Sequence, residues 1–313
     1  MDIKVMDNSN QIRIIRAFAT IVIVLYHSFC PFMSRGWGMF DVKILDDIGN
    51  IFFIDILSDK MLPTFFVISG MLYSKKKKYM GQKQSYVWKK FDRLMIPYAL
   101  FTSLYYLLIV PVFGESIASG HLWFLPTLFL CFVVAIFTEN IGIKYKLLIS
   151  LFMIFIADKL SLISIYLLQI SFLCQYLFYF FFGEGIFNVI CILRKVKYSI
   201  LFVVAFYIVC ICLNDFPLRG TTLLVSFNLI LFYYVKNSIS PLLLSKIISE
   251  VDKHSFAIYV IHHFLIVLLL QTAFFTYLYV IYPVMGIFIM FIVSFISSFC
   301  ISVFLKKIGF KWL

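Results

Sequence analysis

Apolar runs of about 20 residues recur along the whole chain, and they constrain its fold more than any other feature. A helix of that length crosses about 30 Å of hydrocarbon. Of the 313 residues, 63% are hydrophobic and 13% are charged, whereas a soluble domain carries about 25% charged residues. The runs lack the apolar–polar alternation of barrel strands. The sequence therefore predicts an all-α integral membrane protein.

Ten of these runs are predicted to form a polytopic transmembrane bundle. They cover residues 12–32, 52–73, 91–113, 121–138, 144–157, 161–182, 198–213, 221–236, 254–274 and 283–305. The run at 144–157 is the shortest, so Asp158 and Lys159 would form its outer turn. Because the longest outer loop is about 33–51, we expect a single transmembrane domain over 1–313 and no soluble extracytoplasmic domain.

The charges give the bundle an orientation. With both termini in the cytoplasm, the inner side of the ten segments holds 22 of the 27 Lys and Arg residues. The outer side holds Arg35, Lys43, Lys60, Lys159 and Arg219. This asymmetry is the positive-inside bias, and it accounts for the net charge of +12 without nucleic-acid binding. We expect a multi-pass protein of the plasma (inner) membrane. Seven scattered cysteines without a CxxC pair predict neither a disulfide framework nor a metal site.

Polar residues inside the first segment suggest chemistry. Arg16 and His27 are eleven residues apart, so both face one side of a helix and lie about 16 Å apart along its axis. Arg16 alone could be a snorkelling lipid anchor, and His27 alone could make an interhelical hydrogen bond. Together, a cation at the cytoplasmic mouth and a deeper base suit a long phosphorylated ligand such as acyl-coenzyme A (acyl-CoA).

Two further segments carry candidates on the cytoplasmic half. Ser69 and Gly70 permit close helix packing, and Ser69 could instead donate a hydrogen bond into a cavity. Lys75–Lys78 suit anchoring to anionic lipid. Lys90 and Arg93 are three residues apart and share a helix face, so they could join Arg16 around a phosphate-rich ligand.

Three more histidines lie in two later segments. His121 and Trp123 belong either to an aromatic belt or to an aromatic platform for a sugar ring. His262 and His263 follow Tyr259 in a late segment. Adjacent histidines point about 100° apart on a helix, so at most one of them would face a cavity fully, and either could serve helix packing.

In this order, the motifs resemble the acyltransferase-3 family of membrane O-acyltransferases, from about residue 12 to the C-terminus. The matching stretches are Arg16–Ser28, Phe65–Gly70, Lys89–Pro97, His121–Leu125, Phe182–Gly183 and Ile258–His262. One departure is the lysine pair with a single arginine at 89–93, where the family often has several arginines.

The resemblance implies transfer of an acetyl or related acyl group from cytoplasmic acyl-CoA to a hydroxyl of a cell-surface or lipid-linked polysaccharide. We expect the donor phosphates near Arg16, Lys90 and Arg93. His27 would be the general base, or would carry the acyl group itself, and His262 would orient the site. Substrate would be bordered by Ser69, His121, Trp123 and Tyr259. Acyl-CoA, the glycan and the bilayer are the expected partners, and no metal is expected.

Two other classes of protein also place Arg and His inside membranes. One is a transporter or flippase for a lipid-linked glycan, and the other is a non-catalytic component of a polysaccharide synthesis system. Small size, the absence of visible repeats and the ordered motifs favour the enzyme. The sequence specifies neither the acyl group nor the acceptor nor the oligomeric state.

Overall fold

The computed structural model describes residues 9–29, 52–77, 83–109, 111, 120–162, 170–196, 198–212, 219–235 and 242–311. Every regular element in these ranges is helical, which confirms the all-α part of the predicted fold class. The helices are α1 (Ser9–Phe29), α3 (Phe52–Lys77), α4 (Lys83–Leu108), the short 3₁₀ helix η4 (Gly120–Trp123), α6 (Phe124–Phe137), α7 (Ile143–Leu162), α8 (Ile170–Lys195), α9 (Ser199–Cys212), α10 (Arg219–Tyr234), α11 (Leu242–Leu270), α12 (Ala273–Ile281) and α13 (Pro283–Lys307).

Four described helices are long and apolar enough to cross a membrane. They contain Asn10–Phe29, Ile170–Lys195, Ser245–Leu270 and Pro283–Lys307. Three shorter apolar helices cover His121–Phe137, Ser199–Cys210 and Gly220–Tyr234. The helices α3 and α4 are long as well, but each carries several charged residues at its cytoplasmic end in the predicted orientation. The ten spans and the cytoplasmic termini stay predictions.

Several helix boundaries differ from the predicted ones. The helix predicted from residue 91 begins at Lys83, so Lys90 and Arg93 lie inside α4 rather than at its start. The chain stays helical through Leu162, where the sequence predicted a break after residue 157. The helix predicted to reach residue 274 ends at Leu270. Thr272 caps a separate short helix, α12, by accepting a hydrogen bond from Phe275 N. The proposed outer loop at 33–51 lies outside the described residues.

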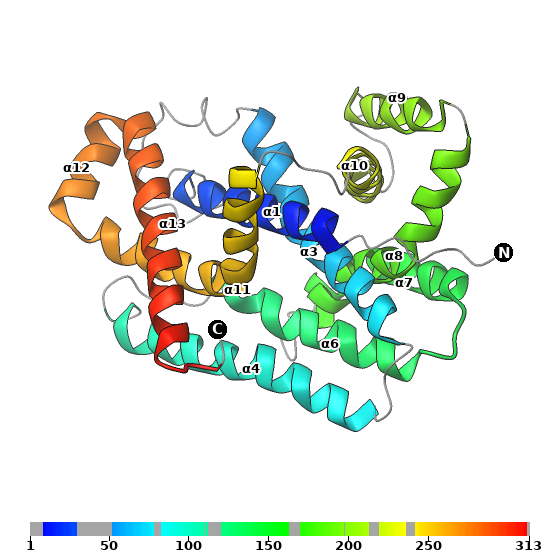
Figure 1. The fold of residues 1–313 in the computed structure, drawn as a ribbon, viewed down its shortest axis with the longest axis horizontal. Coiled ribbons are helices and arrows are strands. Elements are labelled where there is room, and N and C mark those ends of the chain that lie inside the picture. The colour runs from blue at the N-terminus through cyan, green and yellow to red at the C-terminus, as the bar shows by residue number, and fades with distance from the viewer. Residues whose placement is uncertain are drawn as a thin grey trace.

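Three helices form the centre of the molecule. In Figure 1, α1 and α3 cross the middle of the view, with α11 beside α1 and α13 beyond α11. The helices α4 and α6 run together along the lower edge, and α7 packs on α8. The main apolar core joins buried side chains of α1, α3, α4, α6, α8 and α11. This core holds α1, α3, α4 and α11 in place around the candidate site.

The tightest helix crossing joins α3 to α8. A Cβ atom at Gly70 would lie 1.9 Å from the carbonyl oxygen of Phe180, and one at Gly183 would lie 2.0 Å from that of Val67. Both distances are far inside van der Waals contact, so only glycine fits on either helix. The packing interpretation of Gly70 is confirmed, as expected for small residues between membrane helices.

A buried ion pair fastens α7 to the same helix. Lys146 Nζ lies 3.1 Å from Glu184 Oε2, and the Lys146 side chain is 1% exposed. The sequence counts Lys146 among the cations of the inner side. In the structure its charge is balanced by Glu184, so Lys146 adds no net positive charge to that side of the protein.

Candidate functional site

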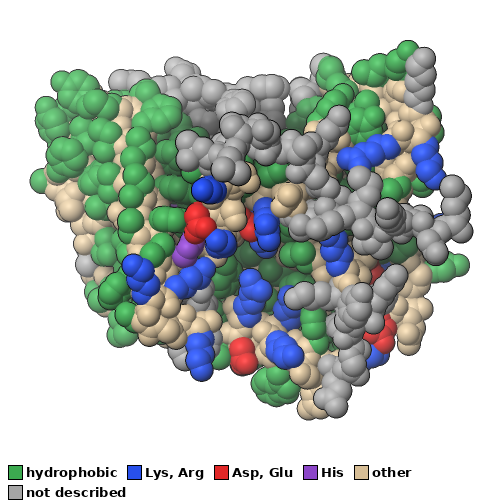
Figure 2. Space-filling view, in the orientation of Figure 1, with side chains coloured by type: hydrophobic (Ala, Val, Ile, Leu, Met, Phe, Trp, Pro, Cys, Tyr) green, Lys and Arg blue, Asp and Glu red, His purple; other side chains and the backbone are tan. Residues whose placement is uncertain are grey.

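A pocket opens between α1, α3, α4, α6 and α11. It encloses about 800 Å³ that protein atoms do not occupy, part of it open to solvent. Figure 2 shows Lys and Arg side chains gathered around a hollow on this face. The polar groups of its lining come from Arg16, Ser69, Lys90, Arg93, Ser255 and Tyr259.

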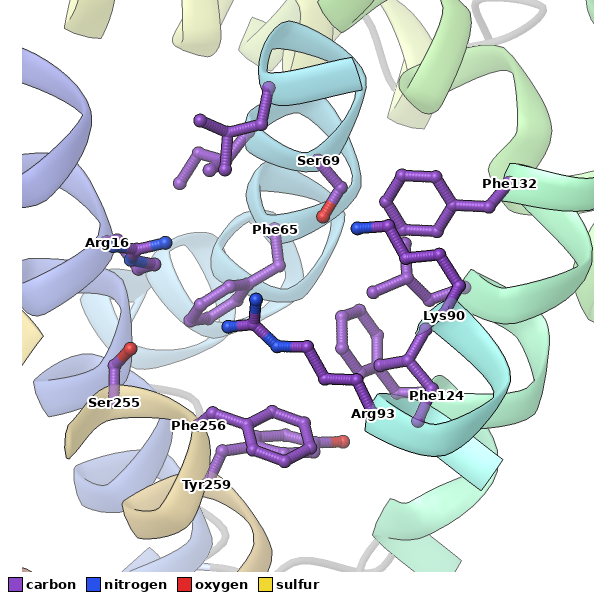
Figure 3. A pocket seen from close by; sticks show the side chains of 14 residues that line it. Arg16, Phe65, Ser69, Lys90, Arg93, Phe124, Phe132, Ser255, Phe256 and Tyr259 are labelled. Carbon is purple, nitrogen blue, oxygen red and sulfur yellow. The ribbon is translucent and has the colours of Figure 1, made fainter. Parts of the chain in front are cut away.

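Three cations enter the pocket from two sides. In Figure 3, Arg16 extends from α1, while Lys90 and Arg93 extend from α4 toward the centre. Lys90 Nζ lies 3.8 Å above the ring of Phe132, a cation–π contact. Within the described ranges Arg93 makes no hydrogen bond or ion pair. The predicted convergence of Arg16, Lys90 and Arg93 is therefore present, and it suits a ligand with several phosphate charges.

Arg16 has a carboxylate partner that the sequence interpretation missed. Its Nε lies 2.5 Å from Asp252 Oδ1, and its Nη2 lies 2.8 Å from Asp252 Oδ2. Asp252 belongs to α11, and its side chain is 6% exposed. Its sequence signal was available. An acid at the start of an apolar run, ten residues before His262, is an ionisable group of the kind that marks functional sites in membranes.

Four histidines meet in one cluster beside Tyr259, and none of them is among the residues that line the pocket. The rings of His27 and His262 lie 4.9 Å apart between centroids. His121 stacks on His263 at 4.2 Å with 16° between the ring planes. His27 lies 6.2 Å from His121. Three separate stretches of sequence, at residues 27, 121 and 262–263, thus converge in one cluster. Both adjacent histidines of α11 take part in the cluster, and neither of them lines the pocket.

Hydrogen bonds assign the protons on two of these rings. His262 Nδ1 lies 2.9 Å from Ile258 O. A carbonyl oxygen only accepts, so this nitrogen carries the proton and His262 Nε2 keeps the lone pair of the neutral ring. His27 Nδ1 lies 3.0 Å from both Ile23 O and His262 Nε2. Because both of these atoms accept, His27 Nδ1 is protonated. The lone pair of neutral His27 is therefore on Nε2.

This arrangement gives His27 the form that a general base needs. In serine hydrolases a carboxylate holds the base histidine in the right tautomer. Here the Nε2 atom of His262 and the carbonyl of Ile23 perform that task. His262 is thus placed to orient the ring of His27 through the contact between its Nε2 and His27 Nδ1.

The remaining pair offers a second acceptor. His121 Nε2 lies 3.4 Å from Val260 O and therefore donates to it, which leaves the lone pair on Nδ1. That Nδ1 is buried and has no hydrogen-bond partner among the residues that the structure describes, and a buried acceptor without a partner costs free energy. His263 Nδ1 hydrogen-bonds the hydroxyl of Tyr105. Nothing in the sequence singled out Tyr105 among 19 tyrosines.

Tyr259 connects the pocket to the histidines. Its ring lines the pocket and lies 6.0 Å from His262 and 5.7 Å from His121. Its hydroxyl donates to the carbonyl oxygen of His121 at 2.5 Å. The aromatic rings of Phe124 and Phe65 lie beside it. Tyr259 therefore contacts both the pocket and the histidine cluster.

Two predicted substrate residues lie apart from each other. Ser69 lines the pocket beside the cations, as Figure 3 shows. Trp123 packs on Phe172, 4.4 Å away with 18° between the planes, and on Tyr176. The structure does not bring Trp123 to the cationic pocket. Trp123 is the last residue of η4, the short helix that also carries His121 of the histidine cluster.

Within the described ranges, no group of three or more His, Cys, Asp or Glu residues is arranged to hold a metal ion. The described cysteines at 131, 174, 191, 210 and 300 are free thiols.

Comparison with known proteins adds the family. The model of the acyltransferase-3 family, described as an acyltransferase domain, matches residues 9–305. No match was found among curated proteins or among solved structures. The family match covers nearly the whole chain, including α1 with its Arg16 and His27 and α11 with its histidine pair. The chain therefore belongs to the acyltransferase-3 family, the family of membrane acyltransferases that its ordered motifs resemble.

Proposed function

We propose that the protein transfers an acetyl or related acyl group from cytoplasmic acyl-CoA to a hydroxyl of a cell-surface or lipid-linked polysaccharide. The observation that carries this proposal is a three-cation pocket that shares α1 and α11 with a histidine whose tautomer is fixed by hydrogen bonds. Arg16 and His27 both lie on α1, while Ser255, Tyr259 and His262 lie on α11. The pocket suits the phosphates of CoA, and the histidine suits the reacting end.

The donor would bind from the cytoplasm. Its phosphates would contact Arg93, Arg16 and Lys90, since guanidinium and ammonium groups form charge-assisted hydrogen bonds with phosphate oxygens. The arm would run past Ser69 and Tyr259 toward His27. About 16 Å separates Arg16 from His27 along α1, so the ligand has to be long and narrow. Acyl-CoA has this shape.

His27 would act as the general base. Its Nε2 takes the proton of the acceptor hydroxyl while the hydroxyl oxygen attacks the thioester carbonyl. The carbon–sulfur bond then breaks, and the CoA thiolate takes the proton from His27. His262 holds the His27 ring in place throughout. The buried Nδ1 of His121 would accept a hydrogen bond from a second hydroxyl of the glycan, with Trp123 bordering the sugar.

The lone pair on His27 also permits direct attack on the thioester. In that variant the acyl group rests on Nε2 before the acceptor takes it. The two routes can be told apart with labelled acyl-CoA and no acceptor. Only direct attack by His27 would then leave a labelled acyl group on the protein.

Thiol release tests the enzymatic proposal against the transporter class. Purified protein in lipid, given acetyl-CoA and an envelope glycan extract, should release free CoA thiol and place the acetyl label on glycan. The His27→Ala variant should release none above background. A transporter or a non-catalytic component would leave acetyl-CoA intact in both preparations, and that result would reject the proposed function.

A further inference from the structure

Asp252 is not among the residues that line the pocket, but it forms an ion pair with Arg16, which does line it. The residues that line the pocket on α11 are Ser255, Phe256 and Tyr259. Asp252 contacts Arg16 through both carboxylate oxygens, at 2.5 and 2.8 Å. This two-point contact uses Nε and Nη2 of the guanidinium. It leaves the Nη1 edge of Arg16 for a ligand in the pocket.

Two polar links between α1 and α11 are found among the described residues, and this contact is one of them. Arg16 pairs with Asp252, and His27 pairs with His262. The links are eleven residues apart on α1 and ten apart on α11, which corresponds to about 16 Å and 15 Å of helix. The two helices therefore run in the same direction in a fixed register. The Arg16–Asp252 link lies at the cationic pocket, and the His27–His262 link lies in the histidine cluster.

We propose that Asp252 is a positioning residue for the acyl donor, acting through Arg16. This inference rests on the proposed function, because it takes CoA as the pocket ligand. A free arginine side chain samples many rotamers, and a ligand that binds it must first order it. Asp252 orders the guanidinium in advance. Without the Asp252 carboxylate, the Arg16 guanidinium would turn toward water and would no longer be oriented toward the pocket.

A pure charge effect would have the opposite sign. Asp252 is negative and lies next to a site for phosphates, so neutralising it without loss of orientation would strengthen CoA binding. Positioning predicts weaker binding. The direction of the change in affinity therefore separates the two roles of the same carboxylate.

The test is CoA binding to the purified full chain in lipid nanodiscs, measured by calorimetry. Asp252→Asn keeps the shape of the side chain and removes its charge, and we expect it to weaken CoA binding about tenfold, the scale of one charge-assisted contact. Arg16→Lys keeps the cation but cannot form the two-point contact, and it should weaken binding similarly. The double variant Arg16→Ala/Asp252→Asn should bind CoA no worse than Arg16→Ala alone.

Glu184→Gln is the matched control. It breaks the other buried ion pair, Lys146–Glu184, away from the pocket, so it should lower thermal stability and leave CoA affinity within about twofold. Unchanged or tighter CoA binding by Asp252→Asn would overturn the positioning role. CoA binding by the wild-type protein in the same experiment would still support CoA as the pocket ligand. Failure of the wild-type protein to bind CoA would overturn both.

Discussion

At the scale of single residues, the main result is a proton assignment. Two backbone carbonyls and one imidazole lone pair require Nδ1–H on both His27 and His262. The sequence could predict that His27 and Arg16 share a helix face, because that follows from spacing alone. It could not predict the partner of His27, because the contact joins residues 235 positions apart and depends on how α1 packs on α11.

The link between the two histidines leads to a first prediction. His262→Phe removes the acceptor of the His27 Nδ1–H, so kcat should fall about 10²-fold, within the range of general-base effects. His262→Gln can place an amide oxygen near the position of Nε2, so it should retain more activity than His262→Phe. Steady-state thiol release from acetyl-CoA measures both.

The fifth histidine supplies the control for these variants. His254 is also on α11 and buried, but it bonds Ser302 Oγ at 2.7 Å on α13. His254→Gln should keep kcat within about twofold. Equal activity of His262→Phe and wild type would show that His262 does not orient His27.

Arg93 gives the second residue-scale prediction. Its guanidinium has no hydrogen-bond or ion-pair partner among the described residues and points into the pocket (Figure 3). Arg93→Ala should raise the KM for acetyl-CoA about 10- to 100-fold, the loss expected for a charge-assisted phosphate contact. Its kcat should stay nearly unchanged, because the residue is remote from the thioester.

The same assay separates Arg93 from general surface charge. Lys253→Ala removes an exposed cation that pairs with Glu250, and it should leave KM at the wild-type value. An Arg93→Ala enzyme with wild-type KM would place the donor phosphates elsewhere.

At the scale of elements, close packing of α3 on α8 holds the pocket wall. The Phe65–Gly70 motif lies on α3, with Phe65, Ile68 and Ser69 facing the pocket and Gly70 facing Phe180. The motif thus contributes to two faces of α3, one that lines the pocket and one that packs on α8. The close packing at Gly70 could be predicted from the small residues, whereas its partner Gly183 was recognised only as a family marker.

This crossing gives a stability prediction. Gly70→Ala would place a methyl group 1.9 Å from the Phe180 carbonyl oxygen, so α3 and α8 have to separate. The cost should be about 1–3 kcal/mol of folding free energy, as for other overpacked cores. Thermal unfolding of the purified variant in detergent measures it.

Gly220 provides the matched substitution. It lies in the first turn of α10, and a Cβ there would meet nothing within 4 Å. Gly220→Ala should be neutral or slightly stabilising, since alanine favours helix over glycine by about 1 kcal/mol. Equal stability of the Gly70→Ala and Gly220→Ala proteins would show that the crossing tolerates a side chain.

The limits of sequence inference also appear at this scale. Composition and hydropathy gave the helical class and most apolar segments. The boundary between α11 and α12 was missed because Thr272 ends one apolar run and caps the next without a glycine or proline there to mark the break. The early start of α4 was missed because its first two turns are polar and hydropathy detects only apolar helix.

At the scale of the whole molecule, the predicted orientation is what brings donor and acceptor to opposite faces. Arg16, Lys90 and Arg93 lie on the side assigned to the cytoplasm, and η4 with Trp123 lies on the other. The orientation derives from the distribution of Lys and Arg, and it fits the parallel course of α1 and α11 inferred from their two polar links. In that arrangement the chain crosses the membrane an odd number of times between the start of α1, on the inner side, and the end of α11, on the outer side.

Cysteine accessibility tests the orientation. In a protein whose seven native cysteines are replaced, Thr272→Cys should react with an impermeant maleimide in intact cells, because it lies between α11 and α12 on the predicted outer side. Gly142→Cys and Gly309→Cys should react only after the cells are opened. Labelling of Gly309→Cys in intact cells would reverse the predicted side of the C-terminal end.

The most direct measurement of the central claim is the mass of envelope glycans from cells that carry wild-type protein or His27→Ala in place of it. General-base catalysis contributes about 10²–10⁴-fold, so we predict that the acyl groups present with wild type are lost with His27→Ala. His254→Gln should keep them, and immunoblots should show equal amounts of all three proteins in the membrane. Unchanged glycan acylation in the His27→Ala cells would contradict the proposed catalytic role of His27.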